Sequence, residues 1–284
     1  MMTLSFRVLK QKNLVTFQIK MSIYNLKEKS ALVTGASSGI GLGISKSLAK
    51  EGVNLLLISR NEKNLSKVVR GLRSEFKIKI DFLPGDVNDS ETLQKAKSIM
   101  SSEFGGCDIL VNNAGGPPMG SFLDFSNTDW DKAFRQNFLS TISFSKEFYP
   151  EMKKKKWGRI INISSTLAKE PTSQMVLSAS MRAGVSAFTK AVSSEMAPHG
   201  VTINTICPGG VLTQRMKDLV EQSAKNQNKT YKEVLKENTK LIPIGRFASP
   251  DEFSKIILFL ISDEASYLTG LSLMADGGLT KSIF

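Results

Sequence analysis

The chain has 284 residues, of which 41% are hydrophobic, and its formal charge is +12. A chain of this length can bury one substantial core, and this composition excludes an intrinsically disordered protein, a collagen-like fibre and a disulfide-rich scaffold. No apolar run reaches the roughly 20 residues that cross a bilayer. Residues 1–29 hold six Lys or Arg and one Glu and so carry +5 of the charge, which leaves the remainder only mildly basic. We expect one globular domain that binds no nucleic acid and no membrane.

The first 25 residues are a basic extension ahead of the first strand-like segment. Residues 1–20 contain no Asp or Glu, which loosely suits an organellar transit peptide, but their apolar spacing is irregular. We expect residues 1–25 to be disordered or to lie outside the mature core, while targeting and a translation start at Met21 stay open. Cys107 and Cys207 lie in apolar segments, so we expect buried thiols and a cytoplasmic protein.

From residue 30 onward, short segments rich in Val, Ile and Leu alternate with amphipathic segments of helical length. The first kind is typical of strands buried on both faces, at 30–35, 53–59, 78–85, 107–113, 158–164, 201–207 and 271–276. The second kind predicts helices at 39–51, 61–74, 89–103, 128–153, 173–197 and 250–262. This alternation predicts an α/β fold over residues 26–284, a single-domain, doubly wound, parallel seven-stranded sheet (a Rossmann fold) with helices on both faces.

In such a sheet, ligands bind outside the carboxyl ends of the strands, so the motifs that follow strands carry the functional prediction. TGASSGIG (34–41) follows the first of these strands and begins a helix. Its glycines allow a tight turn, a close approach of a pyrophosphate and close packing of the helix on the strand, while the helix start offers free N–H groups. The residues expected at the cofactor are Gly35, Ser37, Ser38, Gly39, Ile40 and Gly41.

The form of the dinucleotide is read at the end of the second strand, where an acidic residue would bind a free ribose hydroxyl. Ser59 occupies that place and Arg60 follows it. A planar guanidinium suits a phosphate, so we expect NADP(H), with NAD(H) as the alternative.

Together, these motifs resemble those of the short-chain dehydrogenase/reductase superfamily, and most of all its 3-oxoacyl-[acyl-carrier-protein] reductase-like members, over about residues 26–280. The resemblance implies that GDV (85–87) lies around the adenine, NNAG (112–115) beside the ribose and PGGVLT (208–213) at the nicotinamide. The cofactor residues that it implies are Asp86, Val87, Asn113, Ala114, Gly115, Pro208, Gly209, Val211 and Thr213. The segment 266–278 resembles the closing strand of the family, which implies a homotetramer or homodimer.

The same resemblance implies two catalytic residues that match the family pattern. Asn137, in RQNFLS, matches the Asn that holds a water in the proton path, and Ser165, in INISS, matches the Ser that hydrogen-bonds the substrate oxygen.

The Tyr and Lys of the family do not carry over. Counting from Ser165 and back from AGVSAF (183–188) places Ser178 and Arg182 at their positions. An aliphatic hydroxyl is too weak an acid to replace a phenol, and a guanidinium gives up no proton at neutral pH, although Arg182 can still hold the ribose hydroxyls of the cofactor. We expect water ordered by Asn137 to supply the proton, with Tyr231 as an alternative.

Two further segments indicate that a substrate still binds. GGPPMG (115–120) is a rigid loop with Met119 free to face a substrate, and residues 212–249 have the helical character and position of the substrate lid of the family. The slight excess of basic residues in this lid suits an acidic carrier such as a phosphopantetheine thioester, or merely a solvated helix pair.

The predicted function is therefore an NADP(H)-dependent oxidoreductase with an atypical active site and no metal, which reduces a small carbonyl compound or a 3-oxoacyl thioester or runs in reverse. Two alternatives stay open. One is a nucleotide-binding homologue without turnover, acting as a sensor or structural subunit, and the other is a dehydratase or isomerase on the same scaffold.

Overall fold

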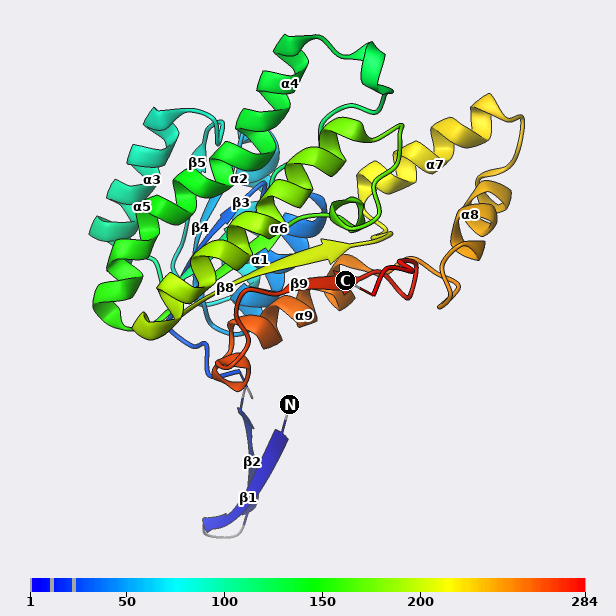
Figure 1. Ribbon diagram of the computed structural model, residues 1–284. Helices are drawn as coiled ribbons and strands as arrows, with labels where there is room; N and C mark the ends of the chain where they lie inside the picture. Colours follow the sequence, from blue (N-terminus) through cyan, green and yellow to red (C-terminus); the bar gives the residue numbers. More distant parts are fainter. Residues whose placement is uncertain (1, 11–12, 22–23, 284) are drawn as a thin grey trace.

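The computed structural model describes the backbone of residues 2–10, 13–21 and 24–283 and the side chains of residues 24–283. Seven parallel strands form one sheet in the order β5-β4-β3-β6-β7-β8-β9 (Figure 1). These strands are β3 (Ser30–Thr34), β4 (Asn54–Ser59), β5 (Ile80–Pro84), β6 (Ile109–Asn112), β7 (Gly158–Ile163), β8 (Val201–Pro208) and β9 (Ser272–Ala275). The strand order reverses between β3 and β6, which is where a doubly wound sheet opens a crevice for a ligand.

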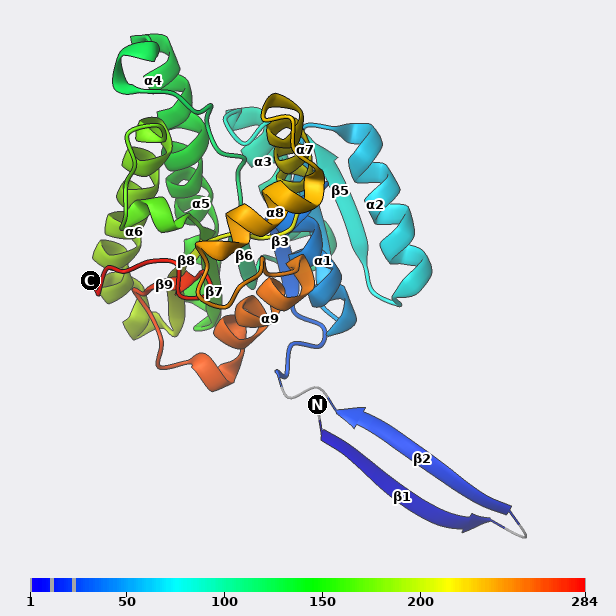
Figure 2. The same cartoon turned by 90° about the vertical axis from the view of Figure 1, so that its right-hand side faces the viewer.

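Helices cover both faces of the sheet, as predicted (Figure 2). The helices α1, α2 and α9 supply one buried cluster, whereas α3, α5 and α6 supply the other. The helices are α1 (Gly39–Lys50), α2 (Glu62–Glu75), α3 (Ser90–Phe104), α4 (Asn127–Phe134), α5 (Ser140–Lys155), α6 (Val176–Met196), α7 (Gln214–Asn226), α8 (Tyr231–Lys240) and α9 (Pro250–Ile261). The predicted doubly wound α/β fold is confirmed.

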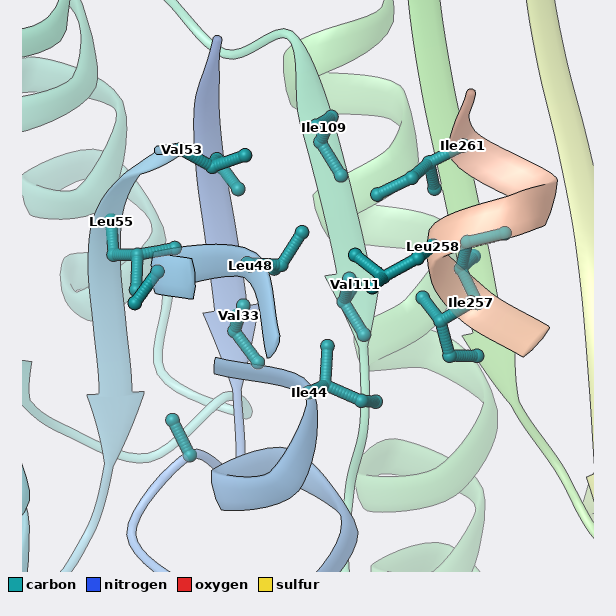
Figure 3. Close-up of a cluster of buried hydrophobic side chains, with 14 of the residues drawn as sticks. Val33, Ile44, Leu48, Val53, Leu55, Ile109, Val111, Ile257, Leu258 and Ile261 are labelled. Carbon is teal, nitrogen blue, oxygen red and sulfur yellow. The ribbon is translucent and has the colours of Figure 1, made fainter. Parts of the chain in front are cut away.

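The strands are mainly apolar because successive side chains enter opposite clusters. In β4, Leu55 and Leu57 belong to the cluster that α1, α2 and α9 cover, whereas Leu56 and Ile58 belong to the cluster that α3, α5 and α6 cover. Figure 3 shows the first cluster, in which side chains of β3, β4 and β6 meet Ile44 and Leu48 of α1 and three residues of α9. Each fully buried Leu or Ile contributes about 2 kcal/mol. This core holds the strand ends in fixed positions.

A chain of buried polar side chains crosses the sheet close to its carboxyl edge. Asn112 Nδ2 donates to Asn162 Oδ1 at 2.9 Å and to Ser145 Oγ at 3.1 Å. Asn162 Nδ2 donates to Thr189 Oγ1 at 2.9 Å, and that hydroxyl lies 2.7 Å from Thr205 Oγ1. Leaving one of these groups unpaired would cost about 1–3 kcal/mol, so the network fixes β6, β7 and β8 against α5 and α6.

The prediction of one uninterrupted helix over 128–153 is wrong in one respect. A π-helical turn, Arg135–Leu139, separates α4 from α5, and the Ser140 N–H donates to the carbonyl of Arg135, five residues back. The spacing of apolar residues did not reveal this turn, because the segments before and after it each keep the normal spacing of an α-helix. π-helical turns are frequent at functional sites, and this one contains Asn137.

The predicted extension, residues 1–25, contains β1 (Met2–Lys10) and β2 (Asn13–Met21). Over the described residues these strands pair antiparallel with each other and with no strand of the larger sheet (Figure 2). The disorder of this extension and its absence from the mature core stay predictions. Of the helices in the described part of the chain, none has the length and hydropathy of a membrane span.

Candidate active site

The glycine-rich turn between β3 and α1 is tied to the segment after β6. Thr34 Oγ1 donates to Asn113 O at 3.1 Å and accepts from Asn113 N at 2.9 Å, while Asn113 Nδ2 donates to Gly35 O at 3.2 Å. A Cβ atom on Gly35 would stand 2.4 Å from Asn113 O, and one on Gly41 would stand 2.3 Å from Gly35 O. Gly35 also has φ +60°. The turn therefore requires glycine at both positions.

This turn forms one wall of a cleft of about 340 Å³ at the carboxyl edge of the sheet. The cleft brings together most of the predicted cofactor residues, from four separate strand ends and from the start of α7: Gly35, Ser37, Ser38, Gly39, Ile40, Arg60, Asp86, Val87, Asn113, Ala114, Gly115 and Thr213. Its size falls within the range of pockets that bind cofactors.

Other predicted cofactor residues do not line this cleft. They are Gly41, Arg182, Pro208, Gly209 and Val211. Gly209 packs against Asp276, where a Cβ would stand 2.7 Å from the side chain, and Val211 is buried. Five residues that sequence reasoning did not assign to the cofactor do line the cleft: Ser59, Gly85, Gln136, Gln214 and Arg215. Each lies within two residues of a predicted site residue, and this closeness in the chain was the signal available in the sequence.

The end of the cleft that β4 and β5 form carries an ion pair. Arg60 lies with its guanidinium 3.8 Å from a carboxylate oxygen of Asp86, and 67% of its side chain is exposed. Ser59, in the place of the acidic residue of NAD-binding proteins, shares a 2.7 Å hydrogen bond with Ser37. This end therefore presents the hydroxyl groups of Ser37 and Ser59 and the guanidinium of Arg60, whose ion pair with Asp86 is long at 3.8 Å.

Asn137 lies on the π-helical turn and is 1% exposed. Its Nδ2 donates to Gly115 O at 2.7 Å, and Gln136 Nε2 donates to the same carbonyl at 3.2 Å. The Asn137 Oδ1 atom is buried and has no hydrogen-bond partner among the described residues. A buried acceptor of this kind is normally paired with an ordered water.

Ser165 follows β7 and is the N-cap of a single 3₁₀ turn, Thr166–Ala168. Its Oγ accepts a hydrogen bond from the Leu167 N–H at 3.2 Å. Because a hydroxyl accepts through a lone pair, its proton stays available for donation to a substrate oxygen.

Ser178 and Arg182 lie one turn apart on α6 and are 4% and 7% exposed. Arg182 Nη1 donates to the carbonyl of Ile163 and Nη2 donates to the carbonyl of Ala114 at 3.0 Å, while Nε is buried without a partner among the described residues. The guanidinium thus joins the carboxyl ends of β6 and β7 and forms no part of the cleft wall. Burial lowers the pKa of Arg182 to about 10, so this side chain stays charged at neutral pH.

The Ser178 hydroxyl forms no hydrogen bond with any residue whose side chain is described. The Oγ atom of Ser178 is not among the fully buried polar atoms that lack a hydrogen-bond partner, so part of this oxygen is accessible to solvent. Both thiols are buried, as predicted, and neither forms a disulfide bond. Cys207 lies close to Arg182, and burial raises the pKa of its thiol.

The predicted lid consists of α7 and α8, which lie beyond the carboxyl end of β8 (Figure 1). They pack together through Val220, Ala224 and Val234, and Tyr231 is half-buried against this cluster. Tyr231 therefore takes part in the helix contact, which argues against the alternative in which it delivers a proton. Within the described range, no group of three or more His, Cys, Asp or Glu side chains has the arrangement of a metal site.

The chain matches the family model of the short chain dehydrogenases over residues 29–224. It is 35% identical over 254 residues to D-beta-hydroxybutyrate dehydrogenase of Cupriavidus necator, and this match covers 89% of the chain and 98% of that protein. It is 32% identical to 3-oxoacyl-[acyl-carrier-protein] reductase FabG of Aquifex aeolicus, with the same coverage. A crystal structure of L-sorbose reductase from Gluconobacter frateurii, complexed with NADPH and L-sorbose, gives a TM-score of 0.89 at 29% identity over 92% of this chain and 99% of that one.

Proposed function

Because the chain belongs to the short-chain dehydrogenase family, we propose that it is an NADP(H)-dependent oxidoreductase that reduces a carbonyl group or oxidises the corresponding alcohol. The observation that carries this proposal is the single cleft in which the glycine turn, Arg60, Asp86 and the segment after β6 meet. The substrate class that we propose is a small ketone or a 3-oxoacyl thioester. Support comes from the names of two relatives, a hydroxybutyrate dehydrogenase and a 3-oxoacyl reductase.

The residues present fit a dinucleotide. Gly35 and Gly39 line the cleft without side chains, so a pyrophosphate can approach the main chain of the turn, and the start of α1 offers free N–H groups. The absence of a carboxylate at Ser59 and the guanidinium of Arg60 favour the 2′-phosphorylated form, with NAD(H) as the second choice. When bound, the nicotinamide supplies a hydride to the carbonyl carbon.

We assign Ser165 the task of binding the substrate oxygen. The Leu167 N–H fixes the orientation of the hydroxyl, and its free proton is donated to the oxygen as negative charge develops there. Such oriented donors contribute about 3 kcal/mol to transition-state stabilisation.

The proton that completes the alcohol needs another source, because the Ser178 hydroxyl is too weak an acid to lose one. We propose that the unpaired Oδ1 of Asn137 holds a water that relays a proton from the solvent: this water donates one proton to the alkoxide and accepts another from the next water. Ser178 and Arg182 then replace the Tyr and Lys of the family. In this scheme Arg182 is a positioning residue that fixes the ends of β6 and β7, and Ser178 binds substrate or water through its accessible hydroxyl.

One observation favours the alternative of a nucleotide-binding protein without turnover. Arg182 already donates to two main-chain carbonyls, its Nε is enclosed and it does not line the cleft, so this cation is poorly placed to hold the ribose of the cofactor. A scaffold that binds the dinucleotide but orients it less firmly would act as a sensor or a structural subunit.

NADPH oxidation separates these two functions. We would measure it with acetoacetyl thioesters and a panel of small ketones, for the natural chain, Ser165→Ala, and the double variant Ser178→Tyr with Arg182→Lys. The proposal expects turnover by the natural chain and a loss of about 100-fold in Ser165→Ala at unchanged NADPH affinity. Tight NADPH binding with turnover only in the double variant would establish the alternative, and an absence of NADPH binding would overturn both.

We also propose that copies of the chain associate as a homotetramer or homodimer. β9 is an edge strand of the sheet, and exposed apolar side chains lie on it and nearby, namely Leu273, Phe259 and Tyr267. Exposed strand edges with apolar neighbours favour pairing with another chain. Light scattering after size exclusion tests this proposal, and a monomer at micromolar concentration would contradict it. The cytoplasmic location stays a prediction.

A further inference from the structure

The first turn of α7 lies directly against the glycine turn. Thr213 caps α7 by accepting the Met216 N–H at 3.2 Å. Its methyl carbon lies 3.3 Å from the position that a Cβ on Gly39 would occupy. The next two residues, Gln214 and Arg215, line the same cleft as the glycine turn. The lid thus brings a cation to the cofactor cleft, 155 residues along the chain from Arg60.

Three charged residues line this cleft, and they differ in their partners. Arg60 lies 3.8 Å from Asp86, so part of its field is already compensated. Arg215 forms no ion pair within the described part of the chain, and Asp218, one turn along α7, accepts a hydrogen bond from Gln214 instead. Arg215 is therefore a guanidinium on the cleft wall without an acidic partner.

A guanidinium without an acidic partner, next to a glycine turn of the kind that binds phosphates, can itself bind a phosphate group. Guanidinium groups bind phosphate oxygens through two parallel hydrogen bonds, and the start of a helix adds favourable dipoles for an anion. Because Thr213 contacts Gly39, the first turn of α7 lies over the pyrophosphate part of the cleft, whereas Ser59 and Arg60 lie at the end of β4.

We infer that Arg215 binds the pyrophosphate of the dinucleotide from the lid side, opposite the amides of the glycine turn. This inference rests on the proposed function, because it presupposes that the cleft holds a pyridine dinucleotide. Arg215 then determines affinity for both forms of the cofactor, whereas the choice between them belongs to Ser59 and Arg60. Because Arg215 lies on α7, its contact with the pyrophosphate would also hold α7 against the cleft when the cofactor is bound.

The test compares Arg215→Met with Lys217→Met in the full-length protein. Lys217 is exposed on the same helix but lies outside the cleft wall, so its substitution removes the same charge without the proposed contact. Dissociation constants for NADPH and NADH are measured by fluorescence titration at several salt concentrations, and circular dichroism checks the fold of each variant.

For Arg215→Met we expect the dissociation constants of both dinucleotides to rise by about 10-fold to 100-fold, as for the loss of a charge-assisted hydrogen bond. Arg215→Lys should fall between this variant and the natural chain, and Lys217→Met should change affinity by less than about twofold. Binding of NADPH should also protect the α7 amides from hydrogen exchange in the natural chain and not in Arg215→Met.

Two results would overturn the inference while leaving the proposed function intact. Weakened binding of NADPH alone would place Arg215 at the 2′-phosphate, and unchanged binding of both cofactors would remove Arg215 from the site. If the natural chain binds neither cofactor, the proposed function itself fails, so the two failures are distinguishable.

Discussion

The requirement for glycine at position 41 gives the sharpest test of how the cofactor turn is built. A Cβ added to Gly41 would stand 2.3 Å from Gly35 O and 2.7 Å from Asn113 Nδ2. The nearest of these atoms belongs to the main chain, so no flexible side chain can move aside. In Gly41→Ala the Gly35 carbonyl has to shift by roughly 1 Å, since favourable contacts lie near 3.5 Å.

The magnitude follows from three contributions to the free energy of unfolding. Overpacking costs about 1–3 kcal/mol, and losing the hydrogen bond from Asn113 to Gly35 O costs about 1–3 kcal/mol. The higher helix propensity of Ala stabilises the folded state by about 1 kcal/mol, because Gly41 lies in the first turn of α1. We expect a net loss of about 1–5 kcal/mol and at least a 10-fold weaker affinity for NADPH, since the turn amides are displaced.

The matched control is Gly71→Ala, in the exposed interior of α2. Nothing lies within 4 Å of the added Cβ there, so the same substitution should stabilise the protein by about 1 kcal/mol and leave NADPH affinity unchanged. Urea unfolding followed by circular dichroism and NADPH fluorescence measure both quantities. The reasoning is refuted if Gly41→Ala unfolds at the same urea concentration as the natural chain and binds NADPH equally well.

Two further predictions concern stability. Asn162→Leu keeps the side-chain shape but removes the partners of Asn112 and Thr189, so we expect the free energy of unfolding to fall by about 2–4 kcal/mol; a fall below about 0.5 kcal/mol in urea unfolding would show that the buried network is dispensable. The hydrogen-bonded guanidinium of Arg246 lowers the pKa of Glu252 to about 2, so this pair stabilises the fold above the ordinary carboxylate pKa and loses its effect as the pH falls from 4.5 to 2. The difference in melting temperature between the natural chain and Glu252→Gln should therefore shrink over that range, and a constant difference would contradict this assignment.

The amino-acid sequence by itself determined the scaffold and the cofactor edge. Strands such as 53–59 are apolar on both faces, and the turn at 34–41 needs glycine for reasons of local geometry. Both properties are set by residues close together in the chain, so they can be predicted without coordinates. The resemblance to the short-chain dehydrogenase/reductase superfamily added Asp86 and Asn113, and both follow strands, in keeping with the rule that ligands bind at the carboxyl edge of a parallel sheet.

Only the tertiary structure decided which partner each polar group has. Arg182 was predicted to reach the cofactor, yet it donates to the carbonyls of Ile163 and Ala114, which lie 19 and 68 residues away. The ion pair of Arg60 with Asp86 and the place of Arg215 on the cleft wall were equally absent from the local pattern. The physical reason is that a long polar side chain bonds to whatever the fold brings within about 3 Å, and that neighbourhood is assembled from strand ends and helix starts far apart in the chain.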